Sequence, residues 1–286
     1  MSGRSRGDLS GFIEFGEHAL AEAVLLLESY FRKTTSTAKG PFDVVTEADH
    51  AVESMFAQRL ARAFPDHAMV GEETGQRSPR VDAEYCWVLD PLDGTINFAA
   101  HQPFFAVSLG LFHGGMPVIG WVCDPIHGER FRAVDGQGAT LNDAPLGQTT
   151  DQNAVLPIGL STGFIEWALR SAGAGIMNKV IERFGKIRIF GSQALHLCYV
   201  AAGRLRLAAS VEAKLWDDAA GALIVTESGR TYAGLNGRSP FPLDPDSPLW
   251  HGRAIGSMAA DLASIASMRE ILGSYGPLPV GAGGVA

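Results

Sequence analysis

Apolar residues in the first third of the chain follow the period of an α-helix. From Leu9 they recur at spacings of three and four, which predicts an amphipathic helix that runs to about Phe31. A second pattern of this kind follows Thr46 and Asp49, which have the spacing of a capping box at a helix N-terminus. Pro65 ends that second helix because proline cannot continue the backbone hydrogen bonding.

Short apolar runs bounded by glycine, proline or polar residues predict strands through the rest of the chain. His113-Gly114-Gly115 and Asp135-Gly136 separate neighbouring runs and indicate hairpin turns. The predicted strands span residues 42–45, 68–70, 85–89, 104–112, 117–124, 129–134, 139–141, 154–160, 187–190 and 205–211. Residues 33–41 and 74–82 are predicted loops, and further helices span residues 165–171, 176–184, 193–202 and 217–227.

This mixture of helices and strands favours an α/β (α+β) fold in which helical layers cover sheets. Residues 9–148 form a predicted N-terminal α+β subdomain, and residues 149–273 a C-terminal α/β subdomain. The polar stretch Thr149–Asn153 is the predicted seam between them. Residues 1–8 and the Gly/Pro-rich residues 274–286 are predicted to be flexible.

Composition narrows the class of protein. The 286 residues are 46% hydrophobic and 19% charged, as in an ordinary soluble domain, and the net charge of −8 argues against a nucleic-acid partner. The three cysteines, Cys86, Cys123 and Cys198, have apolar neighbours and no C-x-x-C spacing, which predicts reduced, buried thiols. With neither a signal-peptide pattern nor a membrane-length apolar run, we expect a cytoplasmic protein without membrane contacts.

The stretch from Trp87 to Phe98 contains the strongest candidates for a metal-binding and phosphate-binding site. An apolar run ends in Asp90 and Asp93, and Pro91 between them is predicted to end the strand. Two carboxylates at a strand end repel each other unless a positive charge lies between them. A hard cation such as Mg²⁺ is the simplest source of that charge. Gly94 and the residue after it then open a helical turn whose free N–H groups suit a phosphate. The alternative is a turn with two solvated carboxylates.

Other polar residues have simple structural explanations when each is taken alone. Glu72 follows a predicted strand, and Asp217 opens a predicted helix, where it would serve as N-cap. Ser192 would cap the predicted helix over residues 193–202 in the same way. The eight histidines lack paired ligand spacing and are predicted to be structural or exposed: His18, His50, His67, His101, His113, His127, His196 and His251. The chain has no G-x-x-x-x-G-K-[ST] phosphate loop, which argues against the use of nucleoside triphosphates.

The order of four motifs resembles the inositol monophosphatase-like family of Mg²⁺-dependent, lithium-sensitive phosphatases. The motifs are D-V-V-T-E-A-D at Asp43–Asp49, G-E-E at Gly71–Glu73, W-V-L-D-P-L-D-G-T-I-N-F at Trp87–Phe98 and W-D-D-A-A-G at Trp216–Gly221. The resemblance extends from about Leu9 to about Leu272. It implies a layered αβαβα sandwich of the inositol monophosphatase and sugar phosphatase type, and a homodimer.

The resemblance also implies roles for individual residues. Two or three Mg²⁺ ions would be held by the side chains of Glu72, Asp90, Asp93 and Asp217 and the carbonyl of Leu92. Asp49 pairs with Thr95 and, with Glu72, directs the attacking water. Substrate contacts would come from Asp93, Gly94, Thr95, Gly191, Ser192, Gln193, Ser210 and Asp217. Glu73 would lie one shell further out, and Asp218 is expected to be no more than a charge at a helix terminus.

The implied reaction is hydrolysis of a small polyol or sugar phosphate, of the inositol 1-phosphate type, by metal-activated water. Histidinol phosphate, fructose 1,6-bisphosphate and phosphoadenosine phosphate are alternative substrates within the family. A non-catalytic regulator that binds proteins of the transcription machinery is an alternative of a different class. Inositol monophosphatases carry a glutamate seven residues before the W-D aspartate, whereas this chain has Ser210 there and Glu212 nearby. We therefore expect relaxed selectivity for inositol phosphate, which a Ser210→Glu change would restore.

Overall fold

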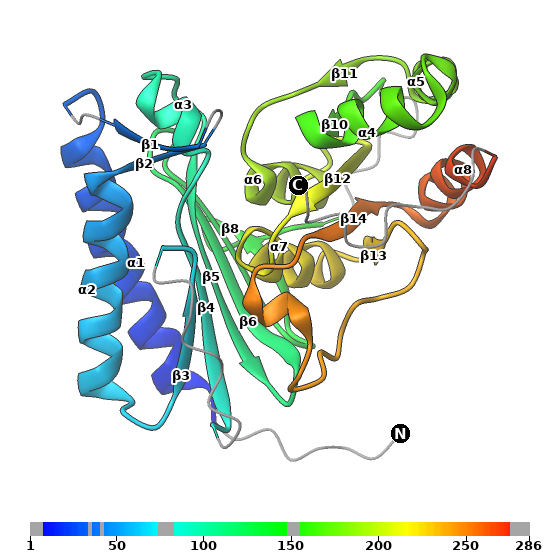
Figure 1. Cartoon of the computed structure of the whole chain (residues 1–286). Coiled ribbons are helices and arrows are strands. Elements are labelled where there is room, and N and C mark those ends of the chain that lie inside the picture. The colour runs from blue at the N-terminus through cyan, green and yellow to red at the C-terminus, as the bar shows by residue number, and fades with distance from the viewer. Residues whose placement is uncertain (1–7, 34–35, 41–42, 74–82, 148–154, 275–286) are drawn as a thin grey trace.

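The computed structural model describes residues 8–33, 36–40, 43–73, 83–147 and 155–274. Two large sheets organise them (Figure 1). The first has seven strands in the order β3-β4-β5-β6-β7-β8-β9, which span Ala68–Gly71, Tyr85–Asp93, Ala106–His113, Met116–Asp124, Glu129–Val134, Gly138–Leu141 and Ala144–Pro145. The second has five strands in the order β11-β10-β12-β14-β13, which span Ile187–Arg188, Ile158–Leu160, Leu207–Ala213, Ile255–Ala260 and Thr231–Gly234.

Three layers of helices alternate with these sheets. Helices α1 (Ser10–Tyr30) and α2 (Glu47–Ala63) cover the outer face of the seven-stranded sheet, and α6 (Gln193–Ala201) and α7 (Leu215–Glu227) lie between the two sheets. Helices α4 (Thr162–Ala172), α5 (Gly175–Phe184) and α8 (Leu262–Gly273) pack on the five-stranded sheet from its other side. This is the αβαβα sandwich that the motifs predict.

The capping box at the start of α2 is confirmed. The backbone N–H of Thr46 donates to Asp49 Oδ2 at 2.9 Å, and the Thr46 hydroxyl supplies the reciprocal contact. Both residues are buried, Asp49 completely. The local sequence therefore holds Asp49 rigidly at the beginning of a helix.

Pro91 does not end the central strand, so that prediction was wrong. Strand β4 continues to Asp93, and its register against β5 shifts between the pairs Asp90–Ser108 and Asp93–Ala106. Two residues of β4, Pro91 and Leu92, thus face the single residue Val107 of β5, which is a bulge, and a bulge accommodates a proline because the ladder is already interrupted there. The bulge brings the two carboxylates to one end of the sheet.

Several other boundaries differ from those predicted. Residues 36–40 form strand β1, paired with β2 (Asp43–Thr46), where a loop was expected. The strand predicted over 187–190 covers only Ile187–Arg188, and that predicted over 154–160 only Ile158–Leu160. The predicted loop 74–82, the seam 149–153 and most of both predicted flexible ends lie outside the described residues. The sequence pattern gave no assignment for β13, β14, α8 or the 3₁₀ turn Pro248–His251.

None of the helices in the described part of the chain is long and apolar enough to cross a membrane. The three cysteines are free and buried, as predicted. Burial raises the pKa of the Cys86 and Cys123 thiols to about 12, so they remain protonated at neutral pH.

Candidate active site

Three carboxylates meet where the two halves of the chain face each other. Asp90 and Asp93 come from the bulged end of β4, and Asp217 comes from the first turn of α7. One oxygen of each lies within 4.8 Å of the other two. Asp217 lies more than a hundred positions after the other two in the sequence, and packing of α7 on the seven-stranded sheet brings it to them.

Burial and mutual repulsion make this cluster electrostatically unfavourable when no cation is present. Burial raises the pKa of Asp90 well above its usual value, and the charges of Glu72, Asp93 and Asp217 raise it further. Burial also raises the pKa of Asp217 to about 8, and the charge of Asp93 adds to that rise. For Asp93, burial raises the pKa to about 6 against the opposing effect of its hydrogen bonds to Ser192 and α6. A divalent cation would relieve all three costs at once.

Glu72 stands just beyond β3, next to this cluster. Its charge acts on Asp90, although its oxygens do not belong to the group within 4.8 Å. Glu73, the next residue, donates its N–H to Glu53 Oε2 at 2.8 Å. Glu53 was not singled out from the sequence, yet it is 1% exposed and holds the backbone of the G-E-E motif. A glutamate between the core residues Val52 and Phe56 was the only signal for it.

Asp49, Thr95 and Leu92 form a connected set beside the aspartates. The Thr95 hydroxyl lies 2.9 Å from the Leu92 carbonyl oxygen and 3.3 Å from Asp49 Oδ1. Asp49 Oδ2 accepts from both the hydroxyl and the N–H of Thr46. The predicted pairing of Asp49 with Thr95 is therefore present, and it is anchored in the capping box of α2.

Gly94 begins the short helix α3 (Thr95–Ala99), as predicted. Its φ of 95° lies in the left-handed region, which a residue with a Cβ rarely adopts. A Cβ added there would also lie 3.1 Å from the Phe104 carbonyl oxygen and 3.2 Å from that of Gly191. Glycine thus lets the chain turn directly from Asp93 into Thr95 against two other segments.

The residues at the start of α6 donate hydrogen bonds to the Asp93 carboxylate. Asp93 Oδ2 accepts from the Ser192 hydroxyl at 2.5 Å and from the Ala194 N–H at 2.7 Å, and Oδ1 accepts from the Gln193 N–H at 3.2 Å. A carboxylate has about four lone-pair sites, so roughly one is left, on Oδ1. The donors that the sequence assigned to substrate are used to orient Asp93.

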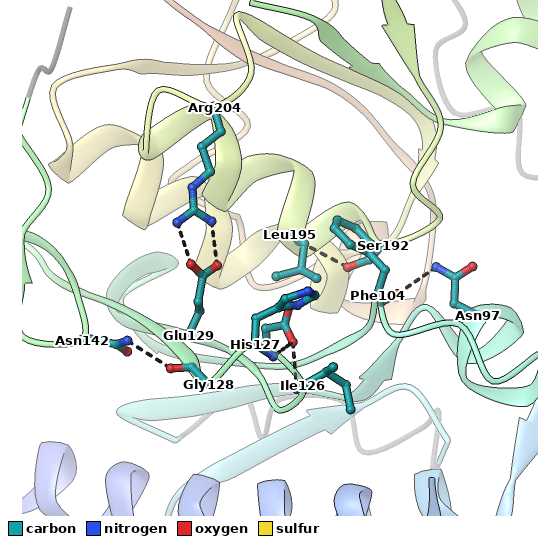
Figure 2. A network of polar contacts seen from close by, with 11 residues as sticks. Asn97, Phe104, Ile126, His127, Gly128, Glu129, Asn142, Ser192, Leu195 and Arg204 are labelled. Atoms are coloured by element: carbon teal, nitrogen blue, oxygen red, sulfur yellow. Dashed lines mark hydrogen bonds and ion pairs between the residues drawn. The ribbon is translucent and has the colours of Figure 1, made fainter. Parts of the chain in front are cut away.

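Asn97 joins the two halves and was missed by the sequence reasoning. Its Nδ2 donates to the carbonyl oxygens of Phe104 and Phe190, each at 2.7 Å. Figure 2 shows the side chain directed at Phe104, close to the Ser192 that caps α6. Asparagine in the central motif gave no signal of this role, because Phe190 is 93 residues away.

Two predictions about the W-D-D motif were wrong. Helix α7 begins at Leu215, so Asp217 is not its N-cap; its Oδ2 accepts the Lys214 N–H at 2.6 Å from inside the first turn. Asp218 is more than a charge at a helix terminus, since it is fully buried. It accepts from Gln193 Nε2 and from the Tyr232 hydroxyl, each at 2.8 Å. Asp218 therefore ties α7 to α6 and β13.

A cleft of about 740 Å³ opens beside the carboxylates. Its lining contains Asp93, Ile96, Ser161, Thr162, Gly163, Glu166, Ile189, Gly191, Ser192, Gln193, His196, Ser210, Glu212, Ala213 and Asp217. All predicted substrate residues except Gly94 and Thr95 are in this lining, and both of these follow Asp93 directly. Among the described residues that line the cleft there is neither lysine nor arginine.

Ser210 belongs to this lining and shapes the backbone that presents Glu212. Its Oγ accepts the N–H groups of Glu212 at 3.2 Å and Ala213 at 3.1 Å, and the register of β12 against β14 shifts between Ser210 and Ala213. The side chain is only 1% exposed. A Ser210→Glu change would bury a longer, charged side chain and remove both contacts. The gain expected from that change therefore does not follow, and we expect a loss of activity on inositol phosphate instead.

Among the described residues, no histidine belongs to the group of possible metal ligands formed by Asp90, Asp93 and Asp217. His127 Nδ1 lies 2.8 Å from the buried Asp124, in a turn near the Glu129–Arg204 ion pair (Figure 2). His67 accepts from the Trp87 indole at 3.0 Å. His196 is the one histidine in the described lining of the cleft. Burial lowers the pKa of its imidazole to about 4.

The sandwich fold, a cluster of three carboxylates of which Asp90 and Asp93 are buried, and a polar cleft are together typical of phosphate hydrolases that use a metal ion. Comparison with known proteins narrows that class. Residues 8–269 match the inositol monophosphatase family, and the chain belongs to that family. It is a phosphoric monoester hydrolase of the inositol monophosphatase type.

Individual relatives are similar over most of the chain. The Nus factor SuhB of Pasteurella multocida is 39% identical over 71% of this chain and 76% of its own length. The inositol-1-monophosphatase of Bacillus subtilis is 36% identical over 73% of this chain and 78% of its own. Among solved structures, the extragenic suppressor protein suhB of Bartonella henselae superimposes with a TM-score of 0.77 at 28% identity, covering 92% of this chain and 98% of that one.

Proposed function

We propose that this protein is a Mg²⁺-dependent phosphomonoesterase whose substrate is the monophosphate of a small polyol or sugar. The observation that carries the proposal is the cluster of Asp90, Asp93 and Asp217 at the base of a cleft that has no cationic side chain in its described lining. A phosphate group is repelled by three carboxylates unless a metal ion lies between them. The residues present therefore fit a hard cation with oxygen ligands.

The ion would be held by Asp90, Asp93, Asp217 and the Leu92 carbonyl, with Glu72 at the edge of the site. When bound, it would supply charge neutralisation on the phosphoryl oxygens and a more acidic water. Leu92 and Asp93 suit this role because each keeps a lone pair after its internal hydrogen bonds are counted. We propose two or three such ions. By the same family resemblance we propose inhibition by Li⁺.

Asp49 and Thr95 would hold and receive the proton of the attacking water. The Thr95 hydroxyl already donates towards Asp49 Oδ1, and that carboxylate is kept in place by Thr46. An alcohol is a weak base, so Thr95 would serve to orient the water while the buried carboxylate accepts charge through it. The backbone of Gly94 and Thr95 would face the phosphate at the start of α3.

A panel of phosphate monoesters tests this proposal. The purified protein with millimolar Mg²⁺ should release phosphate from inositol 1-phosphate, and removal of metal with a chelator should abolish the release. Added Li⁺ should reduce the rate, with Na⁺ at the same concentration as control. A protein that releases no phosphate from any member of the panel, with Mg²⁺ or Mn²⁺, would contradict the proposal.

A protein-binding role in the transcription machinery is a second candidate. What favours it is the 39% identity to a protein named Nus factor SuhB. The two roles need not exclude each other, because the carboxylates lie inside the cleft and leave the outer surface available. Capture of transcription proteins by both the wild type and an inactive Asp93→Asn variant would support a role independent of catalysis.

We further propose a cytoplasmic homodimer, on the strength of the family resemblance. Sedimentation equilibrium measures the assembly state directly. A monomer at micromolar concentration would contradict it.

A further inference from the structure

Helix α2 presents two buried carboxylates to the end of the seven-stranded sheet that carries the site. Asp49, in the first turn of the helix, accepts from the Thr95 hydroxyl at the start of α3. Glu53 follows four residues later, and residues four apart lie on the same face of an α-helix. Asp49 is 0% exposed and Glu53 is 1% exposed. The proposed chemistry uses Asp49 and gives no role to Glu53.

The Glu53 carboxylate lies against the backbone on both sides of Glu72. Its Oε2 accepts the N–H of Glu73 at 2.8 Å. A Cβ added at Gly71 would lie 2.6 Å from the Glu53 Cδ and Oε1, so the carboxylate occupies the space that a side chain at position 71 would need. One buried side chain therefore contacts both the residue before Glu72 and the residue after it.

The sheet by itself holds the segment around Glu72 from one side only. Gly71 is the last residue of β3, where it pairs with Leu89 of β4. Among the described strands, β3 is an edge strand of the seven-stranded sheet. Glu72 lies outside the group of three aspartates within 4.8 Å, although its charge raises the pKa of Asp90. The approach of Glu72 to Asp90 thus depends on where the end of an edge strand lies.

We propose that Glu53 is a positioning residue that holds Glu72 beside Asp90 and so sets the affinity of the site for a divalent cation. This inference rests on the proposed function and concerns the same metal site. Glu53 acts through the backbone of Gly71 and Glu73, and it touches neither the ion nor the substrate. Partners that hold a metal ligand from behind typically account for about 10- to 100-fold in metal affinity or activity.

Cation affinity distinguishes this role from a contribution to stability alone. If Glu53 only stabilises the fold, its loss lowers Tm but leaves the affinity of the folded protein unchanged. Mn²⁺ is a suitable probe because it takes the same kind of oxygen ligands as Mg²⁺. The electron paramagnetic resonance signal of free Mn²⁺ measures binding without any reaction, at a temperature where every variant is folded.

The central test compares Glu53→Ala with Glu53→Gln. Glu53→Ala removes the acceptor of the Glu73 N–H and should raise the Kd for Mn²⁺ about tenfold or more. The Mg²⁺ concentration for half-maximal phosphate release should rise by the same factor, whereas kcat at saturating Mg²⁺ should fall less than about threefold. Glu53→Gln keeps an acceptor oxygen for that N–H, so its Kd should stay within about threefold of the wild type.

Gly71→Ala reaches the same contact from the other side. Its added Cβ would displace the Glu53 carboxylate or the end of β3, so it should also weaken Mn²⁺ binding. In the Glu53→Ala background the same change should add little, because the carboxylate that it meets is gone. Gly11→Ala is the control for the glycine change, because its added Cβ would have nothing within 4 Å.

Glu227→Ala is the matched control for the loss of a carboxylate. Glu227 also accepts backbone N–H groups, from Gly136 at 2.9 Å and from Gly138 at 2.8 Å. It is the last residue of α7, whereas Asp217 lies in the first turn of that helix. Glu227→Ala should therefore keep the Mn²⁺ affinity of the wild type.

The outcomes separate this inference from the phosphatase proposal. Wild-type Mn²⁺ affinity in Glu53→Ala would overturn the positioning role, and so would an equal loss of affinity in Glu53→Gln or in Glu227→Ala. A wild type that binds Mn²⁺ but hydrolyses no phosphate would overturn the phosphatase proposal alone, and the Mn²⁺ titrations would still decide the role of Glu53. A wild type that binds no Mn²⁺ would overturn both. Should Glu53→Ala or Gly71→Ala fail to fold, the other variant decides the question.

Discussion

The two walls of the cleft are built in opposite ways. On the phosphate side, Asp93 is buried and accepts three hydrogen bonds from the start of α6, and Asp49 is buried under its own helix cap. On the side formed by the start of α4 and the end of β12, Glu212 is exposed and is held by the backbone N–H of Gly163. A rigid, desolvated wall suits a reacting group with constant geometry, whereas an exposed wall with few contacts suits a group that differs among substrates.

The difference has an energetic basis. Two buried carboxylates and one half-buried carboxylate within reach of one another cost free energy in the absence of a cation, and the raised pKa values of Asp93 and Asp217 express that cost. Such a site is retained for its chemistry and not for stability. Glu212 carries no such cost because water solvates it. Changes at Asp90, Asp93 or Asp217 should therefore affect catalysis on every substrate.

The largest effect is expected for Asp93→Asn. The amide keeps an oxygen for Ser192 and Ala194 but loses the acceptor of the Gln193 N–H, the charge and the lone pair that we assign to the metal. Removal of a buried charge offsets the loss of the Gln193 contact. We expect kcat to fall about 10²- to 10³-fold on all substrates, with no loss of thermal stability. Steady-state assays at saturating Mg²⁺ and circular dichroism check this. Asp143→Asn, at an exposed turn, is the control, and near-normal turnover by Asp93→Asn would refute the metal assignment.

Asn97→Ala tests the contacts by which the Asn97 side chain connects α3 to the segment before α6. It leaves the carbonyl oxygens of Phe104 and Phe190 without their donor, which should lower the free energy of unfolding by about 2–3 kcal/mol. Activity on all substrates should fall about tenfold as the segment before Ser192 shifts. Urea unfolding and kinetics measure both effects. Asn97→Asp preserves the volume but removes the donors, and a normal Asn97→Asp protein would rule out this explanation.

His196 should make stability depend on pH below neutrality. Burial lowers its pKa from 6.5 to about 4, so between these values the unfolded chain binds a proton that the folded chain does not. Stability is present above pH 6.5 and is lost as pH falls towards 4, by about 2 kcal/mol at pH 5.

Denaturant unfolding at pH 7 and pH 5 measures this loss in the free energy of unfolding. In His196→Asn the loss between the two pH values should be smaller by about 2 kcal/mol. His113→Gln, at a half-exposed position, serves as control. Identical pH dependence in wild type and His196→Asn would show that other groups cause it.

The smallest effect is expected for Mg²⁺ itself on stability. A cation that binds only the folded protein stabilises it by about 1.4 kcal/mol at ten times its dissociation constant, or roughly 2–3 °C in Tm. Thermal unfolding with Mg²⁺ or with chelator measures the shift. Asp93→Asn should lose most of it, and a wild type that is indifferent to millimolar Mg²⁺ would count against the phosphate-side site.

Local patterns in the chain were enough to predict much of the phosphate side. The capping box of Thr46 and Asp49 and the turn at Gly94 each follow from a few adjacent residues, because their hydrogen bonds and backbone angles are local. The buried, free cysteines follow in the same way from apolar neighbours. The family motifs added the layered fold and the association of Asp90 with Asp217, which no local rule relates.

Contacts between distant segments settled the rest. The bulge at Pro91 needs β5 as a partner, Asp218 is buried only because Gln193 and Tyr232 pack over it, and Asn97 spans a gap to Phe190. Glu212 reaches the cleft because Ser210 bends β12 and α4 begins beside it. Each of these depends on where two elements come to lie in space, and short sequence patterns carry only the preferences of neighbouring residues.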